Sequence, residues 1–313
     1  DVADIARVLP ASTAAFSLDK LVIPAISLFY RDLRVEIQKE IRNASERDAS
    51  MLLGYFDSSL EWLERMYDRS SDAQTFFVSL PKKRFHAGAF LQLRPGVNGR
   101  EVLAELEKFF KSVSPRVFVP TLSPEGKKEL DWLVKFLDVR TQMTTLDKRS
   151  ALVVRLAFDW NRMPKAMQDE KTAVFKHFLG KSQEMAFVLD ADALWVIAGA
   201  QWKDVLKEAA ARAGQLPNAR ISTAGMLAAG GWDWRALVIY AIDEFLQMRL
   251  PMPPDSEIVQ QLKSARAVFE KLTYGWITAT AGRLDNGRIG MRFSIERDTW
   301  PVWFAWFLTS KSL

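Results

Sequence analysis

The chain has 313 residues, of which 49% are hydrophobic and 26% charged, proportions that are typical of a globular protein. The absence of cysteine excludes disulfides, zinc–thiolate sites and a cysteine nucleophile. The formal net charge of +5 is spread along the chain, and no segment forms the basic arm expected of a nucleic-acid-binding protein.

The first half of the chain predicts a short strand, a pair of antiparallel helices and a hairpin. The apolar stretch 13–18 is typical of a strand, and apolar residues at helical spacing indicate two helices within 20–69. Asp48 is expected to cap the second of these helices. The remaining elements of this half are a hairpin at 75–93, helices at 100–112 and 125–138, and a polar, turn-like segment at 138–148.

The second half alternates strands and helices in a similar way. The run ALVVRLAF at 151–158 is its clearest single strand, and Gly180 is placed to end the helix that follows. The other expected elements are a helix at 164–179, a hairpin at 184–200, a helix at 201–213, a strand or loop at 221–232, helices at 235–249 and 256–272, and a hairpin at 274–296.

The last hairpin carries the strongest local pattern. Asn286-Gly287 is the preferred pair for a two-residue type I′ turn, because both central residues need positive φ. After this pair, Ile289, Met291 and Phe293 alternate with polar or small residues, as in a half-buried strand. We therefore expect a main component of the sheet here.

The order strand, aspartate, helix or helices, hairpin, helix is predicted three times. The three strand ends are Phe16-Ser17-Leu18-Asp19, Phe158-Asp159-Trp160 and Trp232-Asp233-Trp234. The aspartates are expected to cap helices at strand-to-helix corners rather than to act as catalytic acids. Chance similarity within a chain of mixed strands and helices is the alternative to a true internal repeat.

These patterns predict an α+β fold, in which repeated strand–helix–hairpin units form an antiparallel sheet with helices packed on one face. Residues 1–148 would be the first unit with a long helical insertion. Residues 149–313 would hold the second and third units, and one continuous domain is the alternative.

Residues able to carry chemistry form no recognisable catalytic set. His86 and His177 are the only histidines, and neither has Asp or Glu at metal-ligand spacing. A Gly-x-Ser-x-Gly elbow and glycine-rich phosphate motifs are missing. The sequence thus predicts no catalytic residue, metal site or cofactor. A catalytic Ser-His-Asp triad whose members lie far apart in the sequence is the alternative that the sequence leaves open.

Three carboxylates share one face of the helix that follows Asp48. Asp57, Glu61 and Glu64 lie at helical spacing, and Arg65 and Arg69 stand one turn further on. This arrangement favours a solvated face of ion pairs over an acid–base site.

The most unusual local composition is TWPVWFAWFL at 299–308, where Trp300, Trp303 and Trp306 recur every third residue. It favours a closing element packed into the core, with Trp303 and Trp306 largely buried, because so large an exposed apolar patch is rare. The alternative is a surface that docks a partner or a membrane interface. Trp160 and Trp234 complete the candidate ligand or partner surface.

The segment from Leu9 to Asp19, LPASTAAFSLD, resembles the start of uncharacterised bacterial exported proteins that carry Leu-Pro-Ala-x-Thr-x-x-Phe-x-x-Asp. Those proteins repeat strand, helices and hairpin, and end with a similar hairpin. The resemblance implies an α+β fold and a cell-envelope location, periplasmic or exported, but carries no catalytic residues. The missing initial Met fits removal of a leader or tag.

We therefore expect a non-enzymatic cell-envelope protein that binds a partner protein or an apolar ligand. No apolar run reaches the roughly 18–20 residues of a spanning helix, so only peripheral membrane contact is expected, and no contact with nucleic acid. A hydrolase with scattered catalytic residues and a structural module of a larger envelope assembly are the alternatives.

Overall fold

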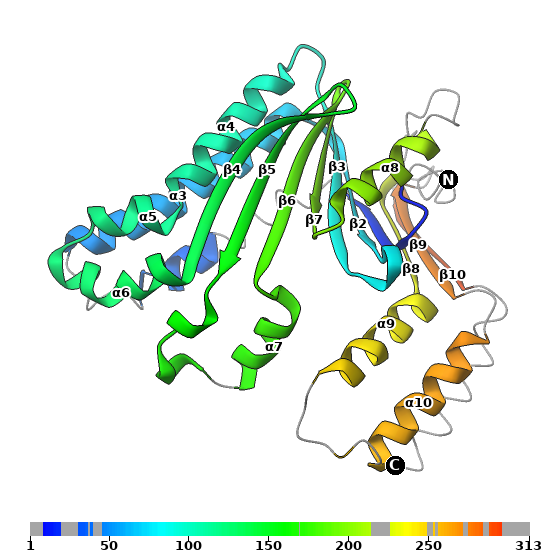
Figure 1. The fold of residues 1–313 in the computed structure, drawn as a ribbon. Helices are drawn as coiled ribbons and strands as arrows, with labels where there is room; N and C mark the ends of the chain where they lie inside the picture. Colours follow the sequence, from blue (N-terminus) through cyan, green and yellow to red (C-terminus); the bar gives the residue numbers. More distant parts are fainter. Residues whose placement is uncertain are drawn as a thin grey trace. The chain divides into compact units, whose positions relative to one another are not determined.

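The computed structural model describes residues 9–19, 31–36, 38–39, 46–168, 170–213, 226–248, 253, 256–271, 275–283 and 288–295. These residues form an α+β fold around a ten-stranded antiparallel sheet, which confirms the predicted fold class (Figure 1). The strand order is β10-β9-β8-β1-β2-β3-β7-β6-β5-β4.

The strands are β1 (Thr13–Asp19), β2 (Ser70–Ser79), β3 (His86–Leu93), β4 (Leu137–Leu146), β5 (Arg149–Phe158), β6 (Ser182–Asp190), β7 (Ala193–Ala198), β8 (Met226–Asp233), β9 (Trp276–Arg283) and β10 (Ile289–Ile295). The α-helices that the structure describes with bounds are α3 (Glu46–Arg69), α4 (Gly99–Ser112), α5 (Pro115–Phe118), α6 (Pro124–Phe136), α7 (Glu170–Leu179), α8 (Trp202–Ala213), α9 (Trp234–Gln247) and α10 (Glu257–Glu270).

The chain divides into two compact units. Unit 1 takes its described residues from 1–19, 75–87 and 203–313, and unit 2 takes them from 20–74 and 88–202. Strands β2 and β3 therefore contribute residues to both units. The sequence analysis divided the chain between residues 148 and 149 on the basis of repeated elements, not of compactness. That division stays a prediction. It falls between β4 and β5, which pair over their full length.

Strand β4 corrects the expectation of a polar turn at 138–148. Its ten residues pair with β5, from Leu137 opposite Phe158 to Leu146 opposite Arg149. The segment lacked a strand signal because it ends the sheet and its residues alternate only weakly in burial. Its polar residues are compatible with an edge strand, where one side of the backbone faces away from the sheet.

Unit 2 is held together by the packing of α4 on the sheet. Asn98 caps this helix by accepting a hydrogen bond from the Arg100 backbone N–H at 3.1 Å. The apolar face of the helix points to the strands because its apolar residues are spaced three and four apart. The buried cluster joins Val102, Leu103 and Leu106 of α4 to Leu91, Leu93, Leu152, Val154, Phe187 and Leu194 of the strands, and to Met66 of α3.

Both faces of the central strands of unit 2 are buried. Phe187 belongs to the cluster under α4, and its neighbours Ala186 and Val188 point to the opposite face, yet both are 0% exposed. Ile197 of β7 is equally buried, and the ring of Trp195 lies 4.7 Å from that of Phe90, measured between centroids. Burial on both faces explains why these strands are almost continuously apolar.

Unit 1 contains a close approach of three strands at Gly231. This residue of β8 pairs with Phe16 of β1 on one side and with Thr278 of β9 on the other. A Cβ atom at Gly231 would stand 2.9 Å from Phe16 Cε1 and 3.1 Å from Thr278 Cγ2. Glycine therefore makes room for the Phe16 ring, which is 5% exposed and lies 5.9 Å from the ring of Trp276.

Two of the three predicted helix-capping aspartates are confirmed. Asp159 follows β5 and accepts from the Asn161 backbone N–H at 3.2 Å. Asp233 ends β8 and accepts from the Ala236 backbone N–H at 3.1 Å, at the start of α9. The side chain of Asp19 lies outside what the structure describes.

The predicted hairpin at the end of the chain is confirmed as β9 and β10. Ile277, Ala279 and Ala281 lie opposite Ile295, Phe293 and Met291. The turn residues Asn286 and Gly287 lie outside the described residues. A regular two-residue turn at this pair would place Arg283 opposite Gly290, whereas Arg283 lies opposite Ile289, so the register differs by one residue from the one expected.

Candidate functional site

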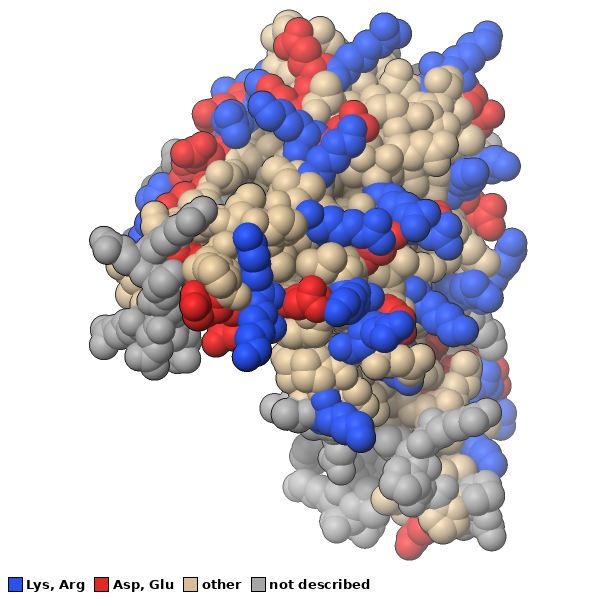
Figure 2. Space-filling view, turned by 60° about the vertical axis from the view of Figure 1, so that its left-hand side comes forward, with Lys and Arg blue, Asp and Glu red and all other residues tan. Residues whose placement is uncertain are grey.

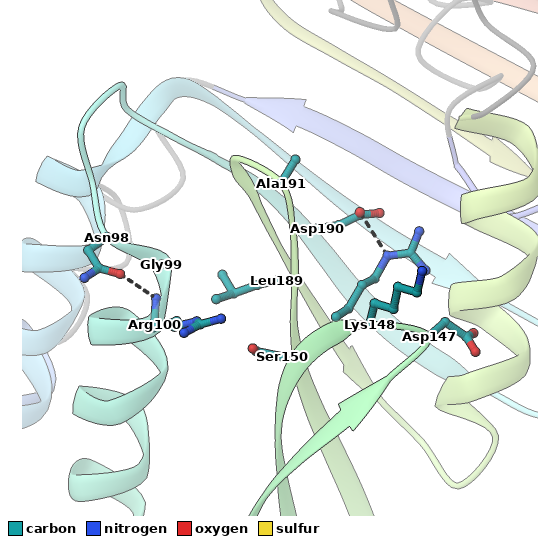
Figure 3. Close-up of a pocket in the computed structure, with 10 residues that line it drawn as sticks. Asn98, Gly99, Arg100, Asp147, Lys148, Ser150, Leu189, Asp190 and Ala191 are labelled. Carbon is teal, nitrogen blue, oxygen red and sulfur yellow. Dashed lines mark hydrogen bonds and ion pairs between the residues drawn. The ribbon is translucent and has the colours of Figure 1, made fainter.

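A polar pocket of about 480 Å³ lies in unit 2, where one helix start and two hairpin turns come together (Figure 3). The helix is α4, and the turns join β4 to β5 and β6 to β7. The lining residues are Asn98, Gly99 and Arg100 from the helix, Asp147, Lys148, Arg149 and Ser150 from the first turn, and Leu189, Asp190 and Ala191 from the second.

Left-handed backbone shapes both turns. Asp147 and Lys148 have φ values of 48° and 67°, and Ala191 has a φ of 55°. Positive φ at two central residues is the type I′ conformation, which matches the twist of paired strands. For residues other than glycine it carries some strain, which paired strands on both sides hold in place. The turns therefore present their side chains from a fixed backbone.

Gly99 sets the distance between α4 and β6. A Cβ atom at this position would stand 2.7 Å from Leu189 Cδ2. Because glycine has none, the first turn of the helix packs directly on Leu189 (Figure 3). The start of α4, where the helix dipole is positive, is thus brought to the pocket.

The three basic side chains of the pocket differ in their partners. Arg149 Nε lies 2.9 Å from Asp190 Oδ1, close enough for an ion pair. The same Nε is buried and makes no hydrogen bond of good geometry within the described residues. Arg100 and Lys148 are exposed and have no acidic partner in the part of the chain that the structure describes. With Asp147, the lining carries three cations and two carboxylates.

The sequence analysis did not single out Arg100, Lys148 or Arg149. Each is ordinary in its local context, since basic residues are common at exposed helix starts and hairpin turns. They become neighbours only because β4 pairs with β5 and α4 packs on β6. No motif in the sequence could have identified them together.

The predicted aromatic surface is only partly described. Trp160 is half-buried in unit 2, with its ring 5.3 Å from that of Phe136, and its Nε1 donates to the Gly180 carbonyl at 2.6 Å. Trp234 begins α9 in unit 1, and its backbone N–H donates to the Gly275 carbonyl at 2.8 Å. Neither residue lines the pocket. Trp300, Trp303 and Trp306 lie outside the described residues, so this surface stays a prediction.

The two histidines differ in their surroundings, since His86 is buried and His177 is half-buried on an exposed helix. His86 on β3 is 1% exposed, and its Nδ1 is 3.1 Å from the Arg84 carbonyl oxygen. Burial lowers the pKa of His86 below its ordinary value, which favours the neutral ring. His177 on α7 lies edge-on to Phe178, with ring centroids 5.4 Å apart.

A hydroxyl–carboxylate cluster in unit 1 is the arrangement closest to that of a hydrolase. Ser12 Oγ donates to Glu208 Oε2 at 2.6 Å and lies 2.5 Å from Ser79 Oγ. The Ser12 backbone N–H donates to the same carboxylate oxygen at 3.0 Å. Two donors from one residue fix Glu208 against the start of β1, which is what a structural connection between α8 and the sheet requires.

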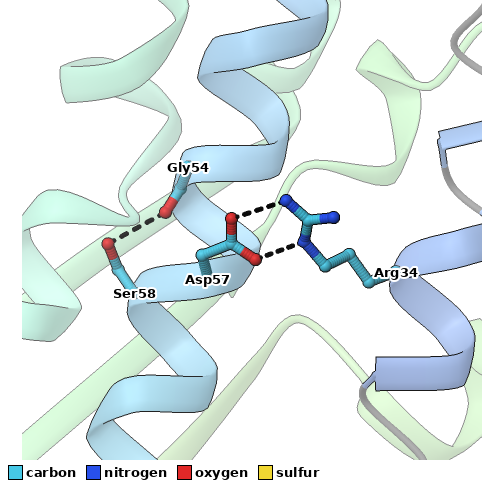
Figure 4. A network of polar contacts seen from close by, with 4 residues as sticks. All are labelled: Arg34, Gly54, Asp57 and Ser58. Atoms are coloured by element: carbon cyan, nitrogen blue, oxygen red, sulfur yellow. Dashed lines mark hydrogen bonds and ion pairs between the residues drawn. The ribbon is translucent and has the colours of Figure 1, made fainter.

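Two of the three carboxylates on α3, Asp57 and Glu64, form ion pairs with partners other than the predicted ones, and Figure 4 shows the pair of Asp57 with Arg34. Asp57 accepts from Nε and Nη2 of Arg34, the latter at 2.9 Å. Glu64 accepts from Arg31 at 2.7 Å, and Arg69 pairs with Glu105 of α4 at 2.8 Å. The hydrogen bond from Arg34 lowers the pKa of Asp57. This face of α3 is therefore a set of partly solvated ion pairs.

The described residues contain no group of three or more His, Asp and Glu side chains placed to hold a metal ion. Within the same parts of the chain, no helix combines the length and apolarity needed to cross a membrane. Figure 2 shows Lys and Arg side chains interspersed with Asp and Glu over the visible face. Charges of both signs lie side by side there, in keeping with the mixed charge of the sequence.

Strand β10 in unit 1 exposes three large apolar side chains. Ile289, Met291 and Phe293, the β10 apolar row, are 66%, 69% and 63% exposed. Because alternate residues of a strand share a face, they form one continuous row. Such an exposed row is typical of an interaction surface rather than of an ordinary solvated strand.

Comparison with known proteins adds no relative. No protein-family model matches the chain, and no curated protein and no solved structure matches it.

Proposed function

We propose that this protein is a non-enzymatic binding protein of the cell envelope, and that its pocket in unit 2 holds a small anionic group. The group would be a phosphate, sulfate or carboxylate carried by a ligand or by a partner protein. The observation that supports this most is the convergence of Arg100, Lys148 and Arg149 on one cavity. The polar lining favours such a group over the apolar ligand expected from the aromatic content.

The chemistry of the three cations suits an oxyanion. A guanidinium group offers several N–H donors in a plane, which matches the oxygens of a carboxylate or phosphate. Arg149 keeps a buried Nε–H without a well-aligned acceptor, although its charge is balanced by Asp190. Arg100 and Lys148 outnumber Asp147, the other carboxylate of the lining, which leaves an excess of one positive charge. An anion would therefore gain both charge and hydrogen-bond donors.

The size and openness of the pocket indicate a small and weakly held group. A volume of about 480 Å³ lies within the usual range for small-molecule sites, which is roughly 300–1,000 Å³. Arg100 and Lys148 are exposed, so salt screens their charges. Binding should be weak and should weaken further as the salt concentration rises.

Calorimetric titration with inorganic phosphate and with citrate, using glycerol as the neutral comparison, tests this proposal. We expect each of Arg100→Gln and Lys148→Gln to weaken anion binding by roughly threefold to tenfold, which corresponds to about 0.7–1.4 kcal/mol. The double variant should bind neither anion detectably.

Lys108→Gln is the matched control. Lys108 is an exposed lysine of α4 outside the pocket lining, so its replacement removes the same charge from the same helix. If the double variant bound phosphate and citrate as well as the Lys108→Gln variant does, the pocket would not be the anion site.

The envelope location rests on two observations of the sequence. One is the resemblance of the segment from Leu9 to Asp19 to exported bacterial proteins. The other is the cysteine-free chain, which is compatible with an oxidising compartment. Fractionation of cells that express the protein from its natural gene, with detection of the protein in the periplasmic or cytosolic fraction, tests it. Recovery in the cytosol alone would contradict this location.

The internal repeat also belongs to this proposal. The order strand, helix or helices, two-stranded hairpin recurs as β1 to β3, β5 to β7 and β8 to β10. Asp159 caps a short 3-10 turn after β5, and Asp233 caps α9 after β8, at corresponding corners of the second and third copies. These correspondences support three diverged units, with β4 as an additional edge strand.

A further inference from the structure

The β10 apolar row lies at an end of the sheet. β10 is the last strand in the order, so one of its edges has no neighbouring strand among the described residues (Figure 1). Within the hairpin, Met291 and Phe293 lie opposite Ala281 and Ala279, which are too small to cover them. β10 thus presents an open backbone edge and an exposed apolar row together.

Such an edge needs a partner. Edge strands of soluble proteins are usually protected by charges on the exposed row, by proline or by a bulge, since an unprotected edge pairs with other strands. Here Arg292 belongs to the opposite face, and β10 contains no proline. Its seven residues pair with β9 without a bulge. Arg292 is the one charge within β10, so this edge has little of the protection that a solitary edge strand requires.

We propose that β10 pairs with β10 of a second copy of this chain, antiparallel about a twofold axis. In such a pair, the numbers of two residues that lie opposite each other always add up to the same sum. The same surface therefore serves both copies. An even sum is needed to keep the apolar rows of both copies on one face, because alternate residues change sides.

Charge and the extent of the apolar row together select one register among the even sums. A pair centred on Gly290 would place Arg288 opposite Arg292, and a pair centred on Arg292 would place that residue opposite itself. Like charges directly opposite each other are destabilising. A pair centred on Met291 places Arg292 opposite Gly290 and Arg288 opposite Ser294. In the same register Ile289 meets Phe293 and Met291 meets Met291, so the apolar rows cover each other.

The same kind of contact already occurs once in the sheet. β3 and β7 are each the second strand of a hairpin, and they are neighbours in the strand order. The Leu93 backbone N–H donates to the Asp192 carbonyl at 2.7 Å, and the tilted rings of Phe90 and Trp195 lie 4.7 Å apart across the two strands, measured between centroids. β10 is also the second strand of its hairpin, and the second copy would give it the same kind of neighbour.

Analytical ultracentrifugation of the full 313-residue chain tests the association. We expect a concentration-dependent dimer between about 1 and 200 µM, in the range typical of modest interfaces. Met291→Lys places two cations opposite each other at the centre of the pair and should weaken the dimer at least about tenfold. Ile258→Lys is the matched control, because Ile258 is 52% exposed on α10 of the same unit, and this variant should associate as the unchanged chain does.

Cysteine cross-linking tests the register without weakening the edge, and the chain contributes no cysteine of its own. Directly opposite residues have Cα atoms about 4.5–5.5 Å apart, which permits a disulfide. Oxidised Met291→Cys should therefore form a covalent dimer. Ile289 lies opposite Phe293 in this register. The two cysteines of an Ile289→Cys dimer would therefore be offset by four residues, with their Cα atoms about 13 Å apart, and should remain unlinked.

Three results would overturn the proposal. The first is a monomer at every concentration, as expected if another segment of the chain or a different protein covers the row. The second is a dimer that Met291→Lys leaves unchanged. The third is cross-linking of Ile289→Cys as rapid as that of Met291→Cys.

Discussion

His86 lies on β3 among charged neighbours that oppose one another. Burial is the largest influence and lowers the pKa of the ring. The nearby charges of Asp204 and Glu208 raise it, while that of Arg84 lowers it. The net direction is downward, so the folded protein favours the neutral ring.

This shift predicts how stability depends on pH. The unfolded chain binds a proton near the ordinary histidine pKa of about 6.5, and the folded chain binds it only at lower pH. The contribution of His86 is therefore fully present above about pH 6.5 and is lost as the pH falls towards the folded pKa.

Urea unfolding of the unchanged chain and of His86→Gln between about pH 5 and pH 8 measures this effect. The two free energies of unfolding should differ by a constant amount above about pH 7 and converge below about pH 6.5. Curves that stay parallel over the whole range would show that His86 is not protected from protonation.

Asp48 shows how a local signal can identify a residue but not its role. The aspartate was expected to cap its own helix, yet α3 begins earlier, at Glu46, and Asp48 is 5% exposed. Its carboxylate accepts from the Ser123 backbone N–H at 2.7 Å and from the Ser123 hydroxyl. The Ser123 hydroxyl caps α6 by accepting from the Gly126 backbone N–H at 3.1 Å. Asp48 thus fixes the start of a helix far along the chain.

Among the elements, two glycines allow a direct comparison of helix propensity with close packing. Gly54 lies within α3, and a Cβ atom there would meet nothing within 4 Å. Gly275 precedes β9, where a Cβ atom would stand 2.6 Å from Asp233 Oδ1 and 2.7 Å from Arg235 Cβ. The same substitution should therefore have opposite effects at the two positions.

We expect Gly54→Ala to raise the free energy of unfolding by roughly 0.5–1 kcal/mol, since alanine favours the helix. Gly275→Ala should lower it by about 1–3 kcal/mol, because the added methyl group pushes on the Asp233 cap of α9. Chemical denaturation followed by tryptophan fluorescence measures both changes. A stabilising effect of Gly275→Ala would mean that this corner is less tightly packed than described.

At the scale of the whole molecule, association through β10 would couple stability to concentration. Unfolding of a dimer releases two chains, so higher protein concentration favours the folded state. With an unfolding entropy of roughly 2.1 cal/mol/K per residue, each tenfold increase should raise the melting temperature by about 1 °C.

Scanning calorimetry of the unchanged chain and of Met291→Lys at several concentrations measures this rise. The variant, whose dimer is expected to be at least about tenfold weaker, should show a smaller rise over the same concentrations. A melting temperature of the unchanged chain that is independent of concentration would count against a dimer whose dissociation accompanies unfolding.

The sequence predicted most of the described elements, since their signals are local. The caps at Asp159 and Asp233 depend on hydrogen bonds to residues two or three positions away. The apolar face of α4 and the β9–β10 hairpin follow from the periods of helix and strand, which are visible within a dozen residues. The mixed α+β class followed from the order of these elements.

Tertiary structure decided what lies far apart in the chain. β4 has little strand pattern of its own and becomes a strand by pairing with β5. Asp57 binds Arg34 of an earlier segment rather than the arginines one turn ahead. The pocket joins residues near 98, 148 and 190, which only the strand pairing and the packing of α4 bring together.

The physical reason is the range of each interaction. Helix propensity, capping and alternation of apolar residues act between neighbours in sequence, so the chain by itself determined most of its elements and its fold class. Ion pairs between elements, the anion pocket and the exposed edge of β10 depend on contacts that exist only once the sheet is assembled. The tertiary structure alone therefore decided where this protein can bind.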